Sequence, residues 1–443
     1  MLFSPRGGSA QVARSIAHEL PVHGWDVTIV SGSCEGLGDA RQFYAGLDVV
    51  AVDFDAGDAP MHPSYEDRPG APDRCFAMVG DEEYAEHVAA WERALTEAGA
   101  PDADLLHLHH LTPLNEAAAR VAPGVPIVGH LHGTELLMLE QIAAGAPDHW
   151  VHADAWAARM RRWAKACERL LVLTPGHAER AQQLLGIDPA CCVVAPNGFD
   201  PQCFKPADID RDAFWREQLL EEPRGWLPGQ EVGTITYEAD EVARMRDAVV
   251  LIAVGRYTEV KRLGLLIRAF AKAQRETKRH AALVILGGHP GEYEAEHPAD
   301  AIVASGAQDV FLAGWRDHAD LPAFFNAADV QVLASVREQF GLVLVEGMAC
   351  GLPPIAVNRY GPSEIVRDGE TGWLVEPDDE AALAQAIVAA VDDPEGRSAR
   401  GIAARRAALE QWSWPSLAAA LSDVLADVAG MAPDGAHTKS NLH

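Results

Sequence analysis

The sequence is poor in cysteine and in basic residues, and it has no long hydrophobic run. Its 443 residues contain 7 cysteines and no Cys-x-x-Cys pair, which argues against both a disulfide framework and a zinc site. The formal net charge of −29 argues against a nucleic-acid-binding surface. No stretch approaches the apolar length of a membrane span, and no signal peptide is expected at the N-terminus. We therefore expect a soluble, cytoplasmic protein.

The chain has enough length and apolar content for two domains. Two domains of about 200 residues each are expected from the length, and the 48% hydrophobic content is ample for two cores. Apolar runs alternate with helical patterns in both halves, which indicates doubly wound parallel α/β sheets. The expected strands are 1–4, 26–31, 47–52, 105–108, 127–129, 170–173 and 192–195 in the first half, and 248–254, 282–288, 310–313, 330–333, 354–357 and 373–375 in the second.

Turn-forming residues at 196–201 mark the boundary between the halves. The expected divisions are an N-terminal domain over 1–197 with an insertion at about 61–101, a C-terminal domain over 198–411 with an insertion at about 208–247, a last helix over 412–430, and a flexible tail over 431–443. Both insertions lie where a loop or lid could reach over a cleft, and we interpret them as solvated decoration. Ligands of such sheets bind at the carboxyl ends of the strands, so the chemistry is expected in the cleft between the halves.

The most informative segment is 338–353, where two glutamates flank a glycine turn that opens an apolar helix. A helix N-terminus offers N–H groups and a positive dipole end to a diphosphate. Glu338 lies just before the turn, where it can accept hydrogen bonds from sugar hydroxyls, and Glu346 lies about one turn into the helix, where it can hold ribose hydroxyls. Carboxylates beside a phosphate are unfavourable unless they bind hydroxyls, so the pair predicts a nucleotide-sugar site. The alternative is a solvated loop glutamate followed by a chance helical one.

Two cations stand where phosphate groups are commonly held. Arg256 and Lys261 follow an expected strand and precede an expected helix. The arginine can bind two oxygens at once, and the lysine acts as a mobile point charge. Together they could offset the charge of a departing diphosphate without a metal; the alternative is a pair of surface cations. Asp-x-Asp pairs at 53–55, 102–104 and 208–210 do not adjoin these motifs, so we expect no metal and no cofactor.

These segments together resemble the retaining glycosyltransferases of family 4, which have the two-domain GT-B fold. The likeness is carried by the Glu-x7-Glu signature at 338–346, by Gly-Arg-Tyr-Thr-Glu-Val-Lys at 255–261, by the glycine-containing segment at 361–377 and by Pro-Asn-Gly-Phe-Asp-Pro at 196–201. It covers most of the chain, strongly after about residue 249. The resemblance implies two Rossmann-like domains facing a central cleft, and a last helix that crosses back to the first domain. It also implies transfer of a hexosyl unit from a nucleotide sugar to an acceptor hydroxyl, with an α-glycoside as product.

The resemblance also implies roles for individual residues. Catalytic roles fall on Glu338, His132, Arg256 and Lys261. The residues expected to bind the donor are Gly7, Gly8, Arg256, Lys261, Trp315, Arg316, Glu338, Phe340, Gly341, Leu342 and Glu346. The expected first strand is shorter than is usual in the family, so either the natural start lies upstream of Met1 or this strand is short.

Histidines crowd two expected strand ends, at 107–110 and 130–132. In the family a histidine at the position of His132 lies beside the donor sugar, although a lone histidine is more often structural. Because side chains alternate along a strand, we expect His130 to lie on the face opposite to His132, in the core. We also expect His107 to be buried. The candidates for the acceptor side are His109, Thr134 and Glu135.

The partners and rival functions follow from the same residues. We expect a nucleotide-sugar donor and a small-molecule, glycan or lipid-linked acceptor. The basic, aromatic segment 159–165 could rest on the inner face of a membrane, although a solvated helix face is the commoner explanation. The rivals are a GT-B nucleotide-sugar epimerase and a non-enzymatic, two-lobed protein that binds a small ligand.

Overall fold

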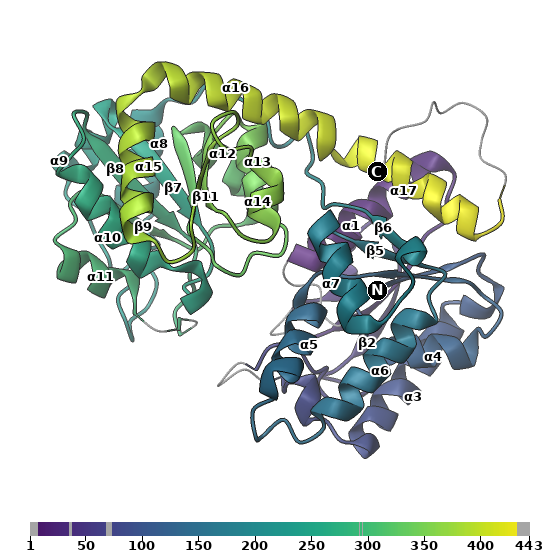
Figure 1. The fold of residues 1–443 in the computed structure, drawn as a ribbon. Helices are drawn as coiled ribbons and strands as arrows, with labels where there is room; N and C mark the ends of the chain where they lie inside the picture. Colours follow the sequence, from purple (N-terminus) through teal and green to yellow (C-terminus); the bar gives the residue numbers. More distant parts are fainter. Residues whose placement is uncertain (1–7, 35–37, 68–72, 292, 295, 432–443) are drawn as a thin grey trace. The chain divides into compact units, whose positions relative to one another are not determined.

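The computed structural model describes residues 8–34, 38–67, 73–291, 293–294 and 296–431. The chain divides into two compact units (Figure 1): an N-terminal unit of Met1–Asn197 with Trp414–His443, and a C-terminal unit of Gly198–Ser413. The expected strand at 1–4, Gly7 and the tail at 432–443 lie outside the described residues. Among the helices described, none has the length and apolar character that crossing a membrane requires.

The N-terminal unit contains parallel strands in two described sheets. Its four-stranded sheet has the order β3-β4-β5-β6, and β1 pairs with β2 in a separate two-stranded sheet. The strands are β1 (Thr28–Ser33), β2 (Asp48–Asp53), β3 (Leu106–His109), β4 (Ile127–His130), β5 (Arg169–Val172) and β6 (Cys192–Val194). Apart from 1–4, the strands expected from the sequence are confirmed, with ends shifted by one or two residues.

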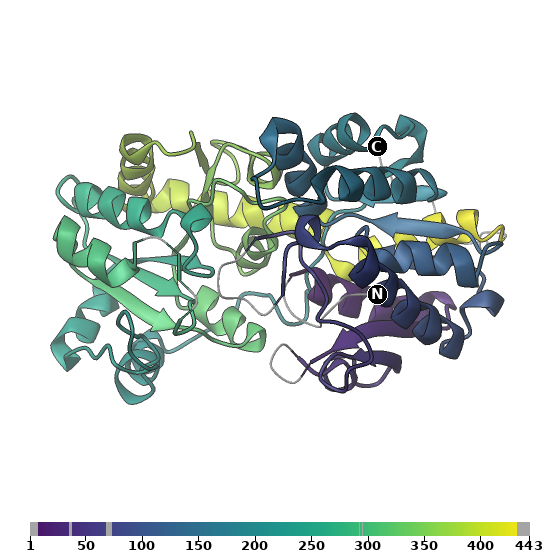
Figure 2. The ribbon, with the colours of Figure 1, turned by 90° about the horizontal axis from the view of Figure 1, so that it is seen from below.

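Helices connect these strands, and the last helix of the chain joins this unit. The helices are α1 (Gly8–Glu19), α2 (Ala40–Phe43), α3 (Asp81–Glu97), α4 (Pro113–Val121), α5 (Thr134–Gly145), α6 (Ala153–Lys165), α7 (Pro175–Leu185) and α17 (Trp414–Val428), with short 3-10 turns η1 (Leu20–His23), η2 (Phe76–Met78), η3 (Ala100–Asp102) and η4 (Pro189–Cys191). Trp414 and Leu421 of α17 pack with Ile16 of α1 against Val128 and Leu171 of the sheet, and α17 lies beside α1 in both views (Figure 1, Figure 2).

The C-terminal unit holds one parallel six-stranded sheet. The strands are β7 (Val249–Val254), β8 (Ala281–Leu286), β9 (Val310–Gly314), β10 (Val330–Leu333), β11 (Pro354–Val357) and β12 (Trp373–Val375). Their order is β9-β8-β7-β10-β11-β12, which is the doubly wound order 3-2-1-4-5-6 when β7 is counted first. The connections therefore change direction between β7 and β10, where such sheets bind their ligands.

The helices of this unit flank the sheet and precede it. They are α8 (Arg211–Arg216), the π-helical turn η5 (Glu217–Glu221), α9 (Ala239–Ala243), η6 (Arg244–Asp247), η7 (Glu259–Lys261), α10 (Leu263–Gln274), α11 (Pro298–Ser305), η8 (His318–Asp320), α12 (Leu321–Asn326), α13 (Leu342–Ala349), α14 (Gly361–Ile365), α15 (Glu380–Asp392) and α16 (Pro394–Gln411). All residues of β8 are buried, as expected for a central strand of a parallel sheet that is covered on both faces.

The interpretation of residues 61–101 as solvated decoration is wrong. Phe76 and Trp91 have no exposed surface and belong to the main hydrophobic cluster of the N-terminal unit. Trp156 of α6 packs against Phe76 with ring centroids 4.7 Å apart, and its indole N–H donates to the carbonyl of Val79 at 2.8 Å. The segment is acidic at its surface, which hid the apolar face of α3 from an argument based on charge.

The second insertion, residues 208–247, is also structural. Trp215 and Trp226 are buried, and the segment covers the edge strand β9. The Leu312 N–H of β9 donates to the Tyr237 hydroxyl at 2.6 Å, and a Cβ on Gly225 would lie 2.3 Å from the Leu312 carbonyl oxygen. Covering the edge in this way satisfies backbone groups that a bare strand would expose to other chains.

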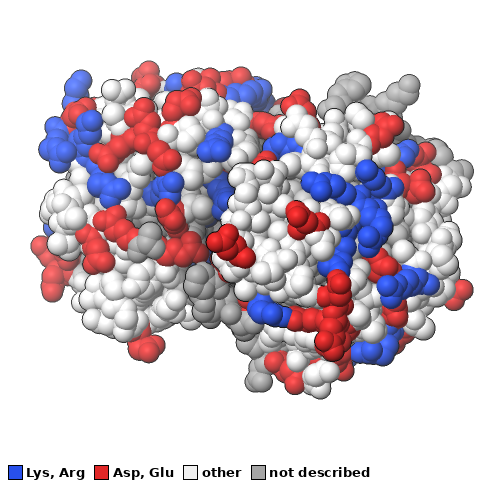
Figure 3. Space-filling view, turned by 60° about the horizontal axis from the view of Figure 1, so that its bottom comes forward, with Lys and Arg blue, Asp and Glu red and all other residues white. Residues whose placement is uncertain are grey.

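The basic segment 159–165 exposes Arg161, Arg162 and Lys165, and its contact with a membrane stays a prediction. Arg159 is buried, donates to Asp81, and lies 4.0 Å over the Tyr84 ring. Trp163 is buried as well, so its aromatic surface is turned inward. The exposed Arg162 is paired with Glu116 at 3.0 Å. On the right-hand part of the face shown in Figure 3, basic side chains gather in one group and acidic side chains in another below it.

Candidate functional site

The C-terminal ends of β7 and β10 carry the two predicted donor motifs. β7 runs into Gly255 and the turn η7, and β10 runs into the loop that contains Glu338. The two loops are joined by a backbone hydrogen bond of 3.0 Å from the Val336 N–H to the Val260 carbonyl. Because β7 and β10 are neighbours on either side of the point where the connections change direction, the two motifs meet at one edge of the sheet.

Lys261 and Glu338 contact each other there. The Lys261 Nζ donates to the Glu338 Oε2 at 2.6 Å, and both side chains are about one-fifth exposed. Gly255 has a φ of 158°, and a Cβ at this position would lie 3.2 Å from the Lys261 Cε. Glycine at 255 therefore leaves room for the lysine stem to run along the backbone. The arrangement presents a cation and a carboxylate side by side, each with part of its surface open.

The loop after Glu338 is held closely before α13 begins. Gly341 is the residue before α13 and has a φ of 104°, a left-handed conformation that favours glycine. The Gly361 N–H donates to the Glu338 carbonyl at 3.2 Å, and a Cβ on Gly361 would lie 2.1 Å from the Phe340 carbonyl oxygen. Phe340 is buried, whereas Leu342, the first residue of α13, is partly exposed.

Glu346 is buried in α13 and is held by a residue that the sequence argument missed. Its Oε1 accepts a hydrogen bond from the Nε2 of His318 at 2.6 Å. Burial raises the pKa of Glu346 above its usual value, although the hydrogen bond from His318 opposes that change. His318 follows β9, whose carboxyl end lies at the same edge as those of β7 and β10. That shared edge was the signal that could have identified it.

The two predicted donor-binding residues after Gly314 divide into an exposed and a buried residue. Trp315 is 48% exposed, so its ring is available to stack on a ligand. Arg316 is only 6% exposed and donates to the carbonyls of Gln218 and Glu222 at 3.0 and 3.1 Å. Burial lowers the pKa of Arg316 to about 10. This arginine holds the second insertion, and its side chain does not reach the surface.

The remaining donor-side predictions fall on exposed positions. Arg256 is exposed directly after Gly255. Gly8 is the first residue of α1, and a Cβ there would meet nothing within 4 Å. Close packing therefore does not explain why residue 8 is glycine. Donor binding at Gly8 stays a prediction.

In the N-terminal unit four histidines form two stacked pairs. His107 faces His130 with 3.3 Å between Nε2 and Nδ1, and His109 faces His132 with 2.9 Å between Nδ1 and Nε2. The paired rings are nearly parallel, with interplanar angles of 8° and 12°. His107 stacks on His109 and His130 on His132, each with centroids 4.6 Å apart. We call these four residues the histidine array.

The array corrects two expectations. The rings of His130 and His132 stack on each other, so the two side chains lie on the same side, and the prediction of opposite faces is wrong. His107 was expected to be buried but is partly exposed, whereas His109 is only 4% exposed. Burial lowers the pKa of His130 to about 3, and it also holds the pKa values of the other three well below the usual range.

The geometry of the array is that of hydrogen-bonded imidazoles. Nitrogen atoms of His107, His109 and His130 lie within 4.8 Å of one another, close enough to consider a metal ion. However, the His107 and His130 nitrogens already pair with each other, and the His109 nitrogen pairs with that of His132. These hydrogen bonds account for the short distances without a metal ion.

A buried carboxylate connects the array to the start of α5. Glu135 has no exposed surface. It accepts hydrogen bonds from the His132 and Gly133 N–H groups at 3.3 and 2.9 Å, and its Oε1 lies 2.5 Å from the His110 Nδ1. Burial would raise the pKa of Glu135, but the interaction with His110 helps to hold it below its usual value. Glu135 thus positions the backbone of His132, and its role on the acceptor side stays a prediction, while Thr134 is partly exposed.

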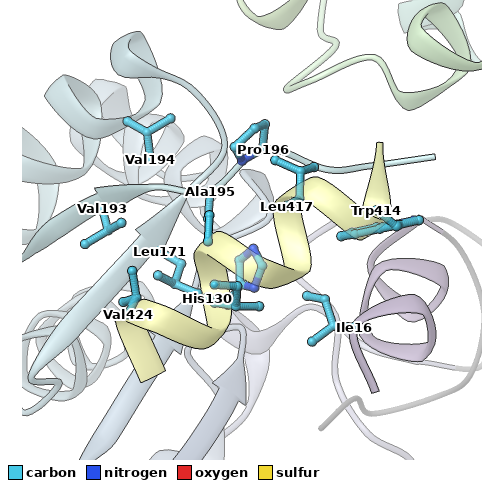
Figure 4. A pocket seen from close by; sticks show the side chains of 12 residues that line it. Ile16, His130, Leu171, Val193, Val194, Ala195, Pro196, Trp414, Leu417 and Val424 are labelled. Carbon is cyan, nitrogen blue, oxygen red and sulfur yellow. The ribbon is translucent and has the colours of Figure 1, made fainter. Parts of the chain in front are cut away.

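A small apolar pocket lies beside the array, between the sheet and α17 (Figure 4). It is lined by Ile16, Leu171, Trp414 and Leu421 among others, and His130 is its one titratable side chain. The His130 Nε2 is buried without a hydrogen-bond partner. The pocket has a volume of about 20 Å³, which is enough for about one water molecule.

Comparisons with known proteins agree with this architecture. The model of "Glycosyl transferases group 1" matches residues 238–407, and the model of "Glycosyltransferase Family 4" matches residues 6–202. Sucrose-phosphate synthase from Thermosynechococcus elongatus superposes with a TM-score of 0.69 at 20% identity, over 97% of this chain and 95% of that one. Anabaena HepE, solved with UDP and glucose, gives 0.67 at 18% identity over 96% and 98%. Two Rossmann-like units of this kind define the GT-B class of glycosyltransferases.

Within that class, the chain belongs to glycosyltransferase family 4. A D-inositol 3-phosphate glycosyltransferase of Catenulispora acidiphila is 29% identical to it over 323 residues, which is 70% of each chain. The resemblance inferred from the glutamate and glycine motifs is thereby confirmed, as is the fold.

Proposed function

We propose that the protein is a retaining hexosyltransferase that uses a nucleoside diphosphate sugar and transfers its sugar to an acceptor hydroxyl as an α-glycoside. The observation that carries this proposal is the contact between Lys261 and Glu338 at the point of the C-terminal sheet where nucleotides bind. A carboxylate and a cation with adjacent open surfaces match the hydroxyls of a sugar and the phosphate that bears it.

The chemistry assigns a role to each group. The bond between the anomeric carbon and the diphosphate oxygen breaks, and a bond to the acceptor oxygen forms on the same face. The departing diphosphate takes the acceptor's proton. Lys261 and Arg256 offset the charge that develops on the diphosphate, as positioned cations do in other transfer reactions. Glu338 orients the sugar, Glu346 holds the ribose and His132 lies at the reacting face. No cofactor or metal has a role in this proposal.

The donor is tested by thermal unfolding with UDP, GDP, ADP and dTDP, each with and without magnesium. A nucleotide present at 100 times its dissociation constant stabilises the fold by about 2.7 kcal/mol. We expect one of the four to raise the melting temperature equally with and without magnesium. A shift that needs magnesium would contradict metal-free binding, and no shift with any nucleotide would contradict the donor site.

Transfer is tested with Glu338→Gln, which keeps the size of the side chain and removes its charge. We expect the rate of transfer to fall by about 100-fold or more, because misplacing the sugar is costly for the reaction, while the unfolding curve stays unchanged. Glu276→Gln, an exposed glutamate of the same unit, is the matched control. Near-wild-type transfer by Glu338→Gln would refute the assignment.

The acceptor requirement separates this proposal from its rivals. Release of nucleoside diphosphate should depend on an acceptor, and inositol 3-phosphate is the first to try because of the named relative. An epimerase would convert the nucleotide sugar without an acceptor, and a binding protein would release nothing.

A further inference from the structure

The loop after β9 brings a partly exposed histidine onto a buried carboxylate. The His318 side chain is 43% exposed, whereas that of Glu346 is 4% exposed, and their Nε2 and Oε1 atoms are 2.6 Å apart. The histidine thus lies between the carboxylate and the surface of the unit. Anything that binds Glu346 from outside must do so beside this imidazole.

The surroundings hold both partners in place. The His318 ring packs against Phe204, a buried residue, with centroids 5.2 Å apart. On the other side, α13 is fixed to β10: the Gln331 Nε2 donates to the Val343 carbonyl at 2.8 Å, and a Cβ on Gly347 would lie 2.2 Å from the Gln331 Oε1. Since the backbone of Glu346 cannot shift without breaking this packing, the direction of its carboxylate depends on His318.

We propose that His318 is a positioning residue that directs the carboxylate of Glu346 toward the ribose hydroxyls of the nucleotide and thereby makes binding selective for ribose over deoxyribose. The inference rests on the proposed function, which puts a nucleotide at this site. The imidazole N–H occupies one lone pair of Oε1. The Oε2 and the second lone pair of Oε1 remain to accept hydrogen bonds from the two vicinal hydroxyls.

Ionisation of the carboxylate gives His318 a second effect. A carboxylate accepts from two hydroxyls, whereas a protonated carboxyl keeps one oxygen as a donor and loses part of that capacity. Burial raises the pKa of Glu346, and the contact with His318 acts in the opposite direction. The same contact that aims the carboxylate therefore also favours its charged form.

The experiment compares the best-bound ribonucleoside diphosphate of the panel (UDP, GDP or ADP) with its 2′-deoxy counterpart by calorimetry. It uses the wild type, His318→Ala, His318→Gln and His280→Ala. Glutamine can place an amide N–H near the position of the imidazole Nε2. His280 is the matched control, because it contacts Asp309 at 2.9 Å and its side chain is 39% exposed, at the opposite end of the sheet.

We expect the wild type to prefer the ribonucleotide by about 10- to 100-fold, the range of a hydrogen bond to a charged group. His318→Ala should lose most of this preference, His318→Gln should recover a large part of it, and His280→Ala should retain it fully. Should His318→Ala fail to fold, His318→Asn, whose amide is too short to reach Glu346, takes its place.

The outcomes separate the two proposals. A wild-type preference that persists in His318→Ala overturns the role of His318 and leaves the proposed function intact. Tighter binding by His318→Ala also overturns it, since the histidine would then be occupying the ribose position. Equal affinity of the wild type for both nucleotides would show that Glu346 does not select ribose, and it would overturn the inference. Failure of the wild type to bind any nucleotide removes the proposed function and this inference together.

Discussion

The two units differ in the titratable groups that they gather at strand ends, although each also holds a buried carboxylate bonded to a histidine: Glu135 to His110 and Glu346 to His318. The N-terminal unit stacks four histidines whose pKa values burial has lowered, so they are uncharged at neutral pH. The C-terminal unit instead keeps two carboxylates, each with a basic partner: Glu338 with Lys261 and Glu346 with His318. An uncharged array can pack like an aromatic core, whereas a charged group in a partly closed site needs a counter-group. The units share a fold type and differ in the electrostatics of the strand ends.

The insertions of the two units also differ in how they stabilise the fold. Residues 61–101 supply aromatic side chains to the main cluster of the N-terminal unit. Residues 208–247 close the open edge of the C-terminal sheet through Tyr237 and the backbone near Gly225. The first insertion stabilises by burial of apolar area, and the second by satisfying and covering a strand edge.

The largest expected effect is on the stability of the N-terminal unit. Trp91→Ala should lower the free energy of unfolding by about 3–5 kcal/mol, because it removes a fully buried aromatic side chain and leaves a cavity. The measurement is denaturant unfolding followed by circular dichroism. Val151→Ala, at a position that is 72% exposed in the same unit, should change stability little. A small effect of Trp91→Ala would mean that residues 61–101 are decoration after all.

An effect of intermediate size is expected on donor binding in the C-terminal unit. Lys261→Ala should weaken the binding of the nucleoside diphosphate by about 1.5–3 kcal/mol, the range of a charge-assisted hydrogen bond. Calorimetry measures this, with Lys278→Ala as control because that lysine is exposed in the same unit. Unchanged affinity of Lys261→Ala would show that the contact with Glu338 is only structural and that this difference between the units has no part in donor binding.

Much of the fold followed from local patterns. Apolar runs bounded by turns located the strands, because a strand buried on both faces must be apolar along its length. The donor motifs could be placed for the same reason: both follow strands, and parallel strands end at one edge. Lys261 and Glu338 were predicted separately from the sequence, and only the strand order of the sheet shows that they come into contact.

The failures have equally physical causes. His318 was missed because its partner lies 28 residues away in the chain and no local pattern encodes that pairing. The insertions were misjudged because acidic surface residues outweighed the buried face of α3 in the average charge. His130 and His132 are two residues apart, a spacing that puts side chains on one face of an extended chain, and their rings stack accordingly.

The smallest effect per residue, and the one that most directly tests the contrast between units, is acid sensitivity. In the unfolded chain each histidine of the array binds a proton below its ordinary pKa of 6.5, whereas in the folded unit it does not. Unfolding therefore takes up protons, and the stability of the N-terminal unit should fall as the pH falls below 6.5, by about 1.4 kcal/mol per pH unit for each histidine. For His130 this loss continues down to its folded pKa of about 3.

Glu346 contributes to the pH dependence of stability with the opposite sign. Its folded pKa is raised above 4.5, so the folded C-terminal unit binds this proton more readily than the unfolded chain, and acid favours the folded state through this group. Hydrogen exchange at pH 7.5 and 5.5, corrected for intrinsic rates, should therefore show protection lost over residues 105–145 while residues 249–357 keep theirs. Equal loss in both units would show that the array does not control the acid response. Loss confined to the C-terminal unit would reverse the comparison, since the carboxylates and not the histidines would then be the groups that acid disturbs.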